Sequence, residues 1–168
     1  MTRPLIIGVM GGGHCDRETC RTAFLLGQLV AAKGWILLNG GRNCGVMDAS
    51  AKGASQAGGL TIGILPDADK SNASAHILVA ICTGMGSARN AINVLSSDIV
   101  VACRGGPGTI SEVALALKSG KQVIGLDFEL GELFPAYKDS GLLFQVTTAE
   151  DAVDLMERLF NRQASGAT

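Results

Sequence analysis

Short apolar runs alternate with segments of helical periodicity along most of the chain, and glycine-rich turns separate them. The apolar runs predict strands at 5–10, 35–38, 60–65, 77–81, 98–103, 122–126 and 142–146. The segments between them predict helices at 16–33, 45–57, 87–95, 109–118 and 149–161, the last with Thr148 as its N-cap. Strands that alternate with helices through short connections form a parallel sheet wrapped by helices. We therefore predict an α/β fold with a doubly wound, Rossmann-like, mostly parallel sheet and helices on both faces.

One domain accounts for the chain, because 168 residues fall within the range of about 100–200 that a single domain occupies. The composition, 47% hydrophobic and 17% charged, is that of a protein with a buried core rather than of a disordered chain. We predict a single ligand-binding domain at 1–162 and a flexible tail at 163–168. Within the domain, Pro135 prevents a long helix in the mixed segment 127–141.

The charge and the cysteines exclude several classes of function. A net charge of −1 without a basic stripe argues against a nucleic-acid partner. The first apolar run is too short to span a membrane and no signal-peptide cleavage site follows it, so we expect a soluble, cytoplasmic protein. The five cysteines are odd in number and form no Cys-x-x-Cys pair, and neither histidine completes a zinc pattern. We expect free thiols in a reducing compartment and no metal held directly by side chains.

Four glycine-rich turns follow predicted strands, at 11–13, 40–42, 84–86 and 105–108. The carboxyl ends of parallel strands share one edge of the sheet, where ligands of such folds bind. Each turn leads into a predicted helix, and a helix N-terminus offers free N–H groups and partial positive charge. The four turns together therefore predict a site for an anionic small molecule.

The nucleotide motifs known for such turns are absent. The first turn reads GGGHCD at 11–16 and lacks the third glycine of the dinucleotide fingerprint. The second strand leads into Asn39 instead of the acid that would bind a ribose hydroxyl. No Gly-Lys-Ser/Thr loop is present either. The sequence thus argues against a nicotinamide cofactor and against a phosphate-binding loop of the P-loop type.

Glu112 has two interpretations that the local sequence leaves open. The stretch TISE at 109–112 matches a capping box, in which the glutamate bonds back to the helix start, and this interpretation fits the local sequence better. The alternative is a carboxylate at the edge of the ligand site, acting on a sugar or accepting a ring N–H. Thr83, Ser87 and Asn90 divide in the same way between helix capping and ligand contact.

Arginines near the glycine turns are candidates for holding an anion, because a guanidinium matches the geometry of a phosphate. Arg89 lies in the first turn of its predicted helix and is the strongest candidate, although a solvated surface arginine would show the same pattern. Arg42 and Arg104 flank glycine turns and are weaker candidates. His14 contacts the ligand or simply begins a helix.

Three segments together resemble the LOG-like superfamily, whose members were often labelled "possible lysine decarboxylase": GGRNCGVM at 40–47, KGASQAGG at 52–59 and GGPGTISE at 105–112. Its cytokinin-activating phosphoribohydrolases cleave the N-glycosidic bond of a nucleoside 5'-monophosphate with an arginine and a glutamate. Arg89 and Glu112 stand at the matching positions. Arg104 stands where that branch has proline and Asn90 where it has lysine, and both departures argue against the hydrolase.

A longer and collinear likeness is to the molybdenum cofactor carrier proteins. It covers IIGVMGGG at 6–13, GWILLNGGRNCGVMDASAKGASQAGGLTIGILP at 34–66, TGMGSARNAINVLSSDIVVA at 83–102 and GPGTISEVALALKSGKQVI at 106–124. The resemblance implies a homo-oligomer, often a tetramer, that binds and protects molybdopterin-bound molybdenum without turnover. Molybdoenzymes or proteins of cofactor synthesis would be its protein partners.

The implied ligand is anionic, with a terminal phosphate and a flat pterin. Arg89 and the glycine turns would take the phosphate or the oxo-metal end, and Asn39, Ser87 and Glu112 would contact the pterin. The metal needs no protein ligand, because the pterin dithiolene already holds it. The predicted cofactor-binding residues are Gly11, Gly12, Gly13, Asn39, Gly40, Gly41, Arg42, Gly86, Ser87, Arg89, Gly105, Gly106, Pro107, Gly108, Thr109 and Glu112. The carrier function implies no catalytic residue, whereas the alternative phosphoribohydrolase would use Arg89 and Glu112.

Overall fold

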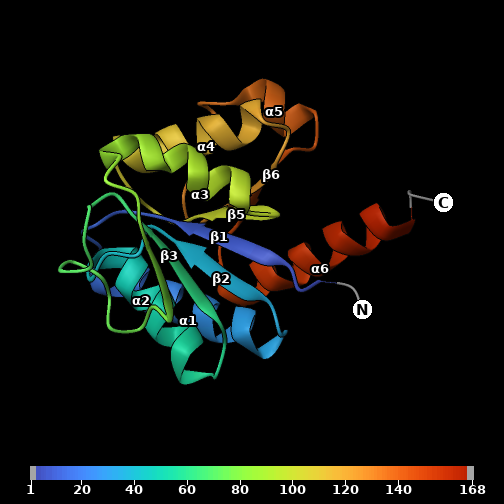
Figure 1. Cartoon of the computed structure of the whole chain (residues 1–168). Coiled ribbons are helices and arrows are strands. Elements are labelled where there is room, and N and C mark those ends of the chain that lie inside the picture. The colour runs from blue at the N-terminus through green and yellow to red at the C-terminus, as the bar shows by residue number, and fades with distance from the viewer. Residues whose placement is uncertain (1–2, 166–168) are drawn as a thin grey trace.

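The computed structural model describes residues 3–165, which form one parallel sheet with helices on both faces (Figure 1). The strands are β1 (Ile6–Met10), β2 (Ile36–Asn39), β3 (Thr61–Leu65), β4 (Val79–Cys82), β5 (Ile99–Ala102), β6 (Gln122–Leu126) and β7 (Leu143–Val146). The helices are α1 (Arg17–Ala32), α2 (Gly45–Gln56), α3 (Asn90–Ser96), α4 (Pro107–Lys118), α5 (Pro135–Asp139) and α6 (Ala149–Ser165), and the 3-10 turn η1 (Gly86–Arg89) precedes α3. The predicted Rossmann-like α/β fold is confirmed.

The strand order β4-β3-β2-β1-β5-β6-β7 places β1 at the centre of the sheet. Gly8 of β1 pairs with Leu38 of β2 on one side and with Val100 of β5 on the other. The chain builds outward from β1 to β4 and then crosses back to β5, so the strand order reverses between β1 and β5. In open α/β sheets, the crevice at such a reversal is where ligands bind.

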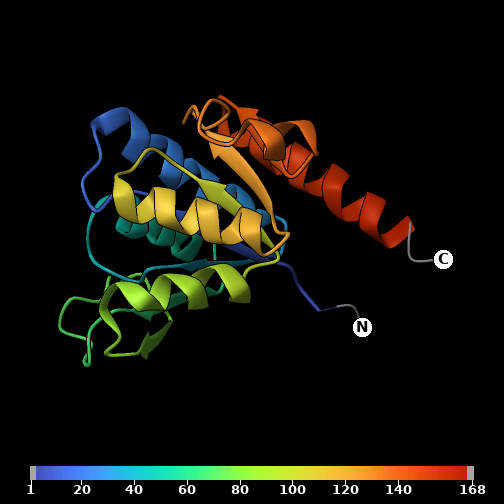
Figure 2. The ribbon, with the colours of Figure 1, turned by 90° about the horizontal axis from the view of Figure 1, so that it is seen from above.

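The two faces of the sheet carry separate apolar layers. Ile7 and Val9 of β1 pack with side chains of α1, α2 and α6. Met10, on the other face of the same strand, packs with α3 and α4. Figure 1 shows α3, α4 and α5 on one side of the sheet and α1 and α2 on the other, and Figure 2 shows α3 and α4 running side by side. Strands buried on both faces explain why their sequences are apolar throughout instead of alternating.

Glycines allow α1 and α2 to cross at close contact. A Cβ at Gly27 would overlap the backbone oxygen of Ser50, and one at Gly53 would overlap the backbone oxygen of Phe24. Backbone thus packs on backbone at this crossing, which no larger residue permits. The crossing fixes the start of α2 and the turn before it, which belong to the site described below.

Several element boundaries differ from those predicted. Pro135 begins the short helix α5 instead of only interrupting one, because proline at the first helical position loses no hydrogen bond. The helix predicted at 87–95 divides into η1 and α3. α6 continues to Ser165, so the first part of the expected tail is helical, since no glycine or proline occurs before Gly166. Thr148 caps α6 as predicted, with its hydroxyl accepting from the Asp151 N–H at 3.1 Å.

Two of the five cysteines depart from the expected free thiols. Cys15 and Cys20 form a disulfide across the start of α1. Asp16 caps this helix by accepting from the Thr19 N–H at 2.7 Å, and the first helical turn then brings the two Cα atoms to 5.8 Å, within the range of a disulfide. Cys103 is a buried free thiol, and burial raises its pKa to about 12. Within residues 3–165, no helix has both the length and the apolar character needed to cross a bilayer.

Candidate ligand-binding site

An open cavity of about 540 Å³ lies where β1, β2 and β5 end. The glycine turns after these three strands, η1, and the first turn of α4 form its walls. The predicted residues that line it are Gly11, Gly12, Gly13, Gly40, Arg42, Gly86, Ser87, Arg89, Gly106, Pro107, Gly108, Thr109 and Glu112. Residues spread over a hundred positions of sequence thus meet at one edge of the sheet.

The turns hold one another through backbone hydrogen bonds. The Gly12 N–H donates to the Arg104 oxygen at 3.1 Å, and the Gly12 oxygen accepts from the Val46 N–H at 3.0 Å. Gly45 starts α2 with a positive φ of 55°, and a Cβ there would overlap the Gly12 oxygen. The first turn is therefore wedged between α2 and the turn after β5, and its position does not depend on a ligand.

Asn39, Gly41 and Gly105 were predicted to bind the ligand, but they do not line the cavity. Asn39 is fully buried, and its amide donates to the Met47 oxygen at 2.9 Å while its oxygen accepts from the Gly41 N–H at 2.8 Å. These bonds shape the turn after β2 and leave nothing for a ligand. Gly41 packs against β3, and Gly105 lies in a neighbouring pocket.

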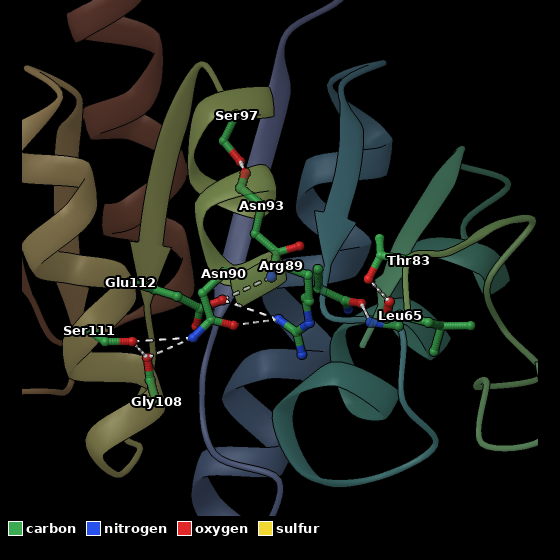
Figure 3. A network of polar contacts seen from close by, with 11 residues as sticks. Leu65, Thr83, Arg89, Asn90, Asn93, Ser97, Gly108, Ser111 and Glu112 are labelled. Atoms are coloured by element: carbon green, nitrogen blue, oxygen red, sulfur yellow. Dashed lines mark hydrogen bonds and ion pairs between the residues drawn. The ribbon is translucent and has the colours of Figure 1, made fainter. Parts of the chain in front are cut away.

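Arg89 and Glu112 face each other in the wall of the cavity (Figure 3). Nη1 of Arg89 lies 3.3 Å from Oε1 of Glu112, and the two side chains are only 11% and 8% exposed. Asn93, fully buried on α3, donates from Nδ2 to the same Glu112 oxygen at 2.8 Å. An ion pair supported by an amide therefore forms part of the cavity wall.

The capping-box interpretation of Glu112 is wrong. α4 begins at Pro107 with Gly106 as its N-cap, two residues earlier than predicted, so Glu112 lies in the second turn. Its carboxylate bonds Asn93 and Arg89 on the neighbouring η1 and α3 instead of the start of its own helix. A tertiary ion pair has replaced the local bond that the sequence favoured.

Burial dominates the electrostatics of this pair. It raises the pKa of Glu112 above its ordinary value, although the hydrogen bond from Asn93 and the charge of Arg89 act in the opposite direction. Burial likewise lowers the pKa of Arg89, against the attraction of Glu112. Both shifts show that the pair is poorly solvated, so it is sensitive to any further charge that enters the cavity.

The other two candidate arginines are already paired with acids. Arg42 lines the cavity but donates to both carboxylate oxygens of Asp67, at 3.1 and 2.7 Å. Arg104 pairs with Asp127 at 3.0 Å and lies in the neighbouring pocket, outside the main cavity. Among the residues 3–165, no group of three or more His, Cys, Asp or Glu side chains is arranged to hold a metal ion.

The start of α4 supplies backbone donors to the cavity. Its N-cap Gly106 makes no side-chain cap, and Pro107 at the first position has no N–H. The next N–H groups, of Gly108 and Thr109, have no partner within their own helix. A helix N-terminus of this kind binds anions such as phosphate. Thr109 lies inside α4 instead of capping it, and it lines the cavity as predicted for a ligand-binding residue.

Sequence reasoning missed several residues of the site. Met10, Met47 and Pro66 add apolar groups to the lining of the cavity, and Asn93 supports Glu112. The methionines carry no signal that distinguishes them from core residues. Asn93 did carry a sequence signal, because it is a polar residue inside the apolar stretch AINVL and lies one helical turn after Arg89.

Comparison with known proteins places the chain among relatives. A family model described as the SLOG cluster4 family matches residues 4–153. The chain belongs to this family. A protein of Archaeoglobus fulgidus, described only as uncharacterized, is 54% identical over 121 residues, which are 71% of this chain and 78% of that protein.

Two solved structures show the same fold over nearly the whole chain. The molybdenum cofactor binding protein of Rippkaea orientalis is 47% identical, covers 95% of this chain and 99% of its own, and has a TM-score of 0.90. The molybdenum cofactor carrier protein of Chlamydomonas reinhardtii is 43% identical with the same coverage and a TM-score of 0.87. These matches confirm the resemblance predicted from the sequence segments.

Proposed function

We propose that this protein binds, protects and carries molybdenum cofactor without turning it over. The observation that carries the proposal is the likeness, over 95% of the chain, to solved proteins named for binding or carrying that cofactor. The cavity supports it, because about 540 Å³ lies within the range of roughly 300–1,000 Å³ that small-molecule sites occupy.

The lining of the cavity suits the chemistry of this ligand. Arg89 and the first turn of α4 would receive the anionic groups, the phosphate or the oxo-metal end. The Glu112 carboxylate would accept the N–H groups of the pterin edge, and Met47 and Pro66 would cover its flat face. The molybdenum would stay on its dithiolene, so no cluster of metal-binding side chains is needed.

We also propose that the chain works in the cytoplasm as a homo-oligomer, with a tetramer as the expected state, and delivers the cofactor to molybdoenzymes or proteins of cofactor synthesis. Leu78, Val79 and Ile81 on and before the edge strand β4, and Leu95 on α3, support self-association because these large apolar side chains are exposed. Light scattering coupled to gel filtration would measure the mass. A monomer at all concentrations would exclude the oligomer.

A second candidate is a phosphoribohydrolase acting on a nucleoside 5'-monophosphate. The observation that favours it is the Arg89–Glu112 pair, because both side chains line the cavity and a carboxylate facing a ribose is the group that such chemistry needs. Incubation with AMP separates the two functions. A steady release of adenine that Glu112→Gln abolishes would establish the hydrolase and overturn a carrier without turnover.

The carrier function is tested by anaerobic calorimetric titration of the purified protein with isolated molybdenum cofactor, alongside Arg89→Ala. We expect saturable binding close to one cofactor per chain, weakened about tenfold or more in the variant, since a hydrogen bond to a charged group contributes about 1.5–3 kcal/mol. Absence of binding to the wild-type protein would overturn the proposal.

A further inference from the structure

Arg89 uses only one of its three side-chain nitrogens to hold its position. Nη1 donates to Oδ1 of Asn90 at 3.0 Å and to Oε1 of Glu112 at 3.3 Å. Nε is buried and has no partner, and Nη2 makes no hydrogen bond to any residue between 3 and 165. The orientation of the guanidinium therefore depends on the two oxygens that Nη1 contacts, and the shorter of these bonds is to Asn90.

Asn90 connects Arg89 to the start of α4 (Figure 3). Its Nδ2 donates to Oγ of Ser111 at 3.2 Å and lies 3.5 Å from the backbone oxygen of Gly108. The Ser111 hydroxyl in turn donates to the same Gly108 oxygen at 2.7 Å. One carboxamide thus accepts from the arginine of the site and donates to the helix turn that presents its free N–H groups.

Glu112, the second partner of Nη1, cannot by itself fix the orientation of the Arg89 guanidinium. Glu112 Oε1 also accepts from Asn93, and Glu112 lies on α4 while Arg89 ends η1. An arginine held only by a carboxylate tends to turn a bidentate edge toward it, because two parallel hydrogen bonds are stronger than one. Such a rotation would direct Nη2 at Glu112 and take it from the cavity.

We propose that Asn90 is a positioning residue of the ligand site. It holds Nη1 of Arg89 so that Nη2 stays available to an oxyanion in the cavity, and it sets Arg89 relative to the N–H groups of α4. The inference rests on the proposed function, because the oxyanion is that of the carried ligand, either its phosphate monoester or its oxo-metal group. Asn90 itself lines the cavity, so its loss would be felt there and not only in the fold.

The test compares Asn90→Ala and Ser111→Ala with the wild-type protein in anaerobic titrations with isolated molybdenum cofactor and with metal-free molybdopterin. We expect Asn90→Ala to weaken binding about tenfold, the effect of losing one charge-assisted hydrogen bond, and Ser111→Ala about threefold. Gln56→Ala is the matched control, because Gln56 is exposed at the last residue of α2, does not line the cavity and makes no side-chain hydrogen bond within residues 3–165. A loss with both ligands places the phosphate at Arg89, and a loss with the metal-bound form alone places the oxo-metal group there.

A second measurement needs no ligand. The Nε–H signal of Arg89 in a ¹⁵N–¹H spectrum, assigned by its absence in Arg89→Ala, reports the position and protection of the guanidinium. We expect it to shift and exchange faster with solvent in Asn90→Ala while the backbone spectrum stays that of a folded protein. Wild-type affinity in Asn90→Ala, or an unchanged Arg89 signal, overturns the positioning role and leaves the carrier function standing. Absence of binding to the wild-type protein overturns the carrier function, and the Arg89 signal then decides the positioning role alone.

Discussion

Gly40 makes room for the guanidinium of Arg89, and replacing it with alanine tests the geometry of the site. A Cβ at position 40 would lie 2.6 Å from Nη2 of Arg89 and 2.7 Å from Sδ of Met47. Nonbonded heavy atoms settle at about 3.5–4.0 Å, so the guanidinium must retreat by about 1 Å. That movement breaks the alignment of Nη1 with Asn90 and Glu112, because bonds of 3.0 and 3.3 Å leave little room to absorb it.

The magnitude of the effect separates binding from stability. Loss of a charge-assisted hydrogen bond from Arg89 to the ligand costs about 1.5–3 kcal/mol of binding free energy. The affinity for molybdenum cofactor then falls about ten- to a hundredfold. The free energy of unfolding should fall by about 0–2.6 kcal/mol, a smaller loss on average, because a methyl that overpacks costs about 1–3 kcal/mol and the stiffer unfolded chain returns about 0.4–1 kcal/mol. Gly40 does not have a positive φ, so alanine fits its backbone conformation.

A double-mutant cycle gives the control. Anaerobic calorimetry would compare Gly40→Ala, Arg89→Ala and the combined variant, with urea unfolding of each. Since the predicted effect acts through Arg89, Gly40→Ala should weaken binding in the wild-type background and add little once Arg89 is gone. Wild-type affinity in Gly40→Ala, or the same loss in both backgrounds, would refute the reasoning.

Two further predictions concern stability. Gly53→Ala should lower the free energy of unfolding by about 1–2 kcal/mol in urea titration. The overlap of the new Cβ with the Phe24 backbone outweighs a gain in helix propensity of about 1 kcal/mol. An increase in stability would contradict the close crossing of α1 and α2. Asp98 is partly buried, which alone would raise its pKa, but hydrogen bonds from Arg3 and the Ile6 N–H lower the pKa below its ordinary value. Its contribution to the free energy of unfolding is therefore present above the ordinary pKa of about 3.9 and is lost as the pH falls below that value. The stability difference between the wild-type protein and Asp98→Asn should therefore shrink from about pH 7 to about pH 3, and a constant difference would contradict this assignment.

The layout of the fold followed from local patterns, because each strand and helix has its own periodicity and its own glycine boundary. The start of α4 did not follow, since TISE at 109–112 satisfies a capping box as well as Pro107 satisfies the first helical position. Only the neighbouring Arg89 and Asn93, on another element, draw Glu112 away from its helix start. Asn39 shows the same limit, because its position at the end of β2 was predictable but the direction of its side chain depends on α2.

The pairing of arginines with acids has a consequence for how a ligand is held. Arg42 is offset by Asp67, and Arg89 by Glu112, so an entering anion competes with a carboxylate already in place. Burial raises the pKa of the Glu112 carboxyl, because the charged form is poorly solvated beside Arg89. We expect such an arginine to bind an anion more weakly than an unpaired one would, and to release it faster. The proposed carrier must give up what it holds, so the Arg89–Glu112 pair would serve ligand release and would need no bond cleavage. Glutamine keeps an oxygen that can accept an N–H of the pterin edge but removes the negative charge that competes for Arg89, so Glu112→Gln should bind the anionic cofactor more tightly and release it more slowly, which stopped-flow dilution would measure. Slower binding or faster release in that variant would show that Glu112 attracts the ligand instead of competing with it.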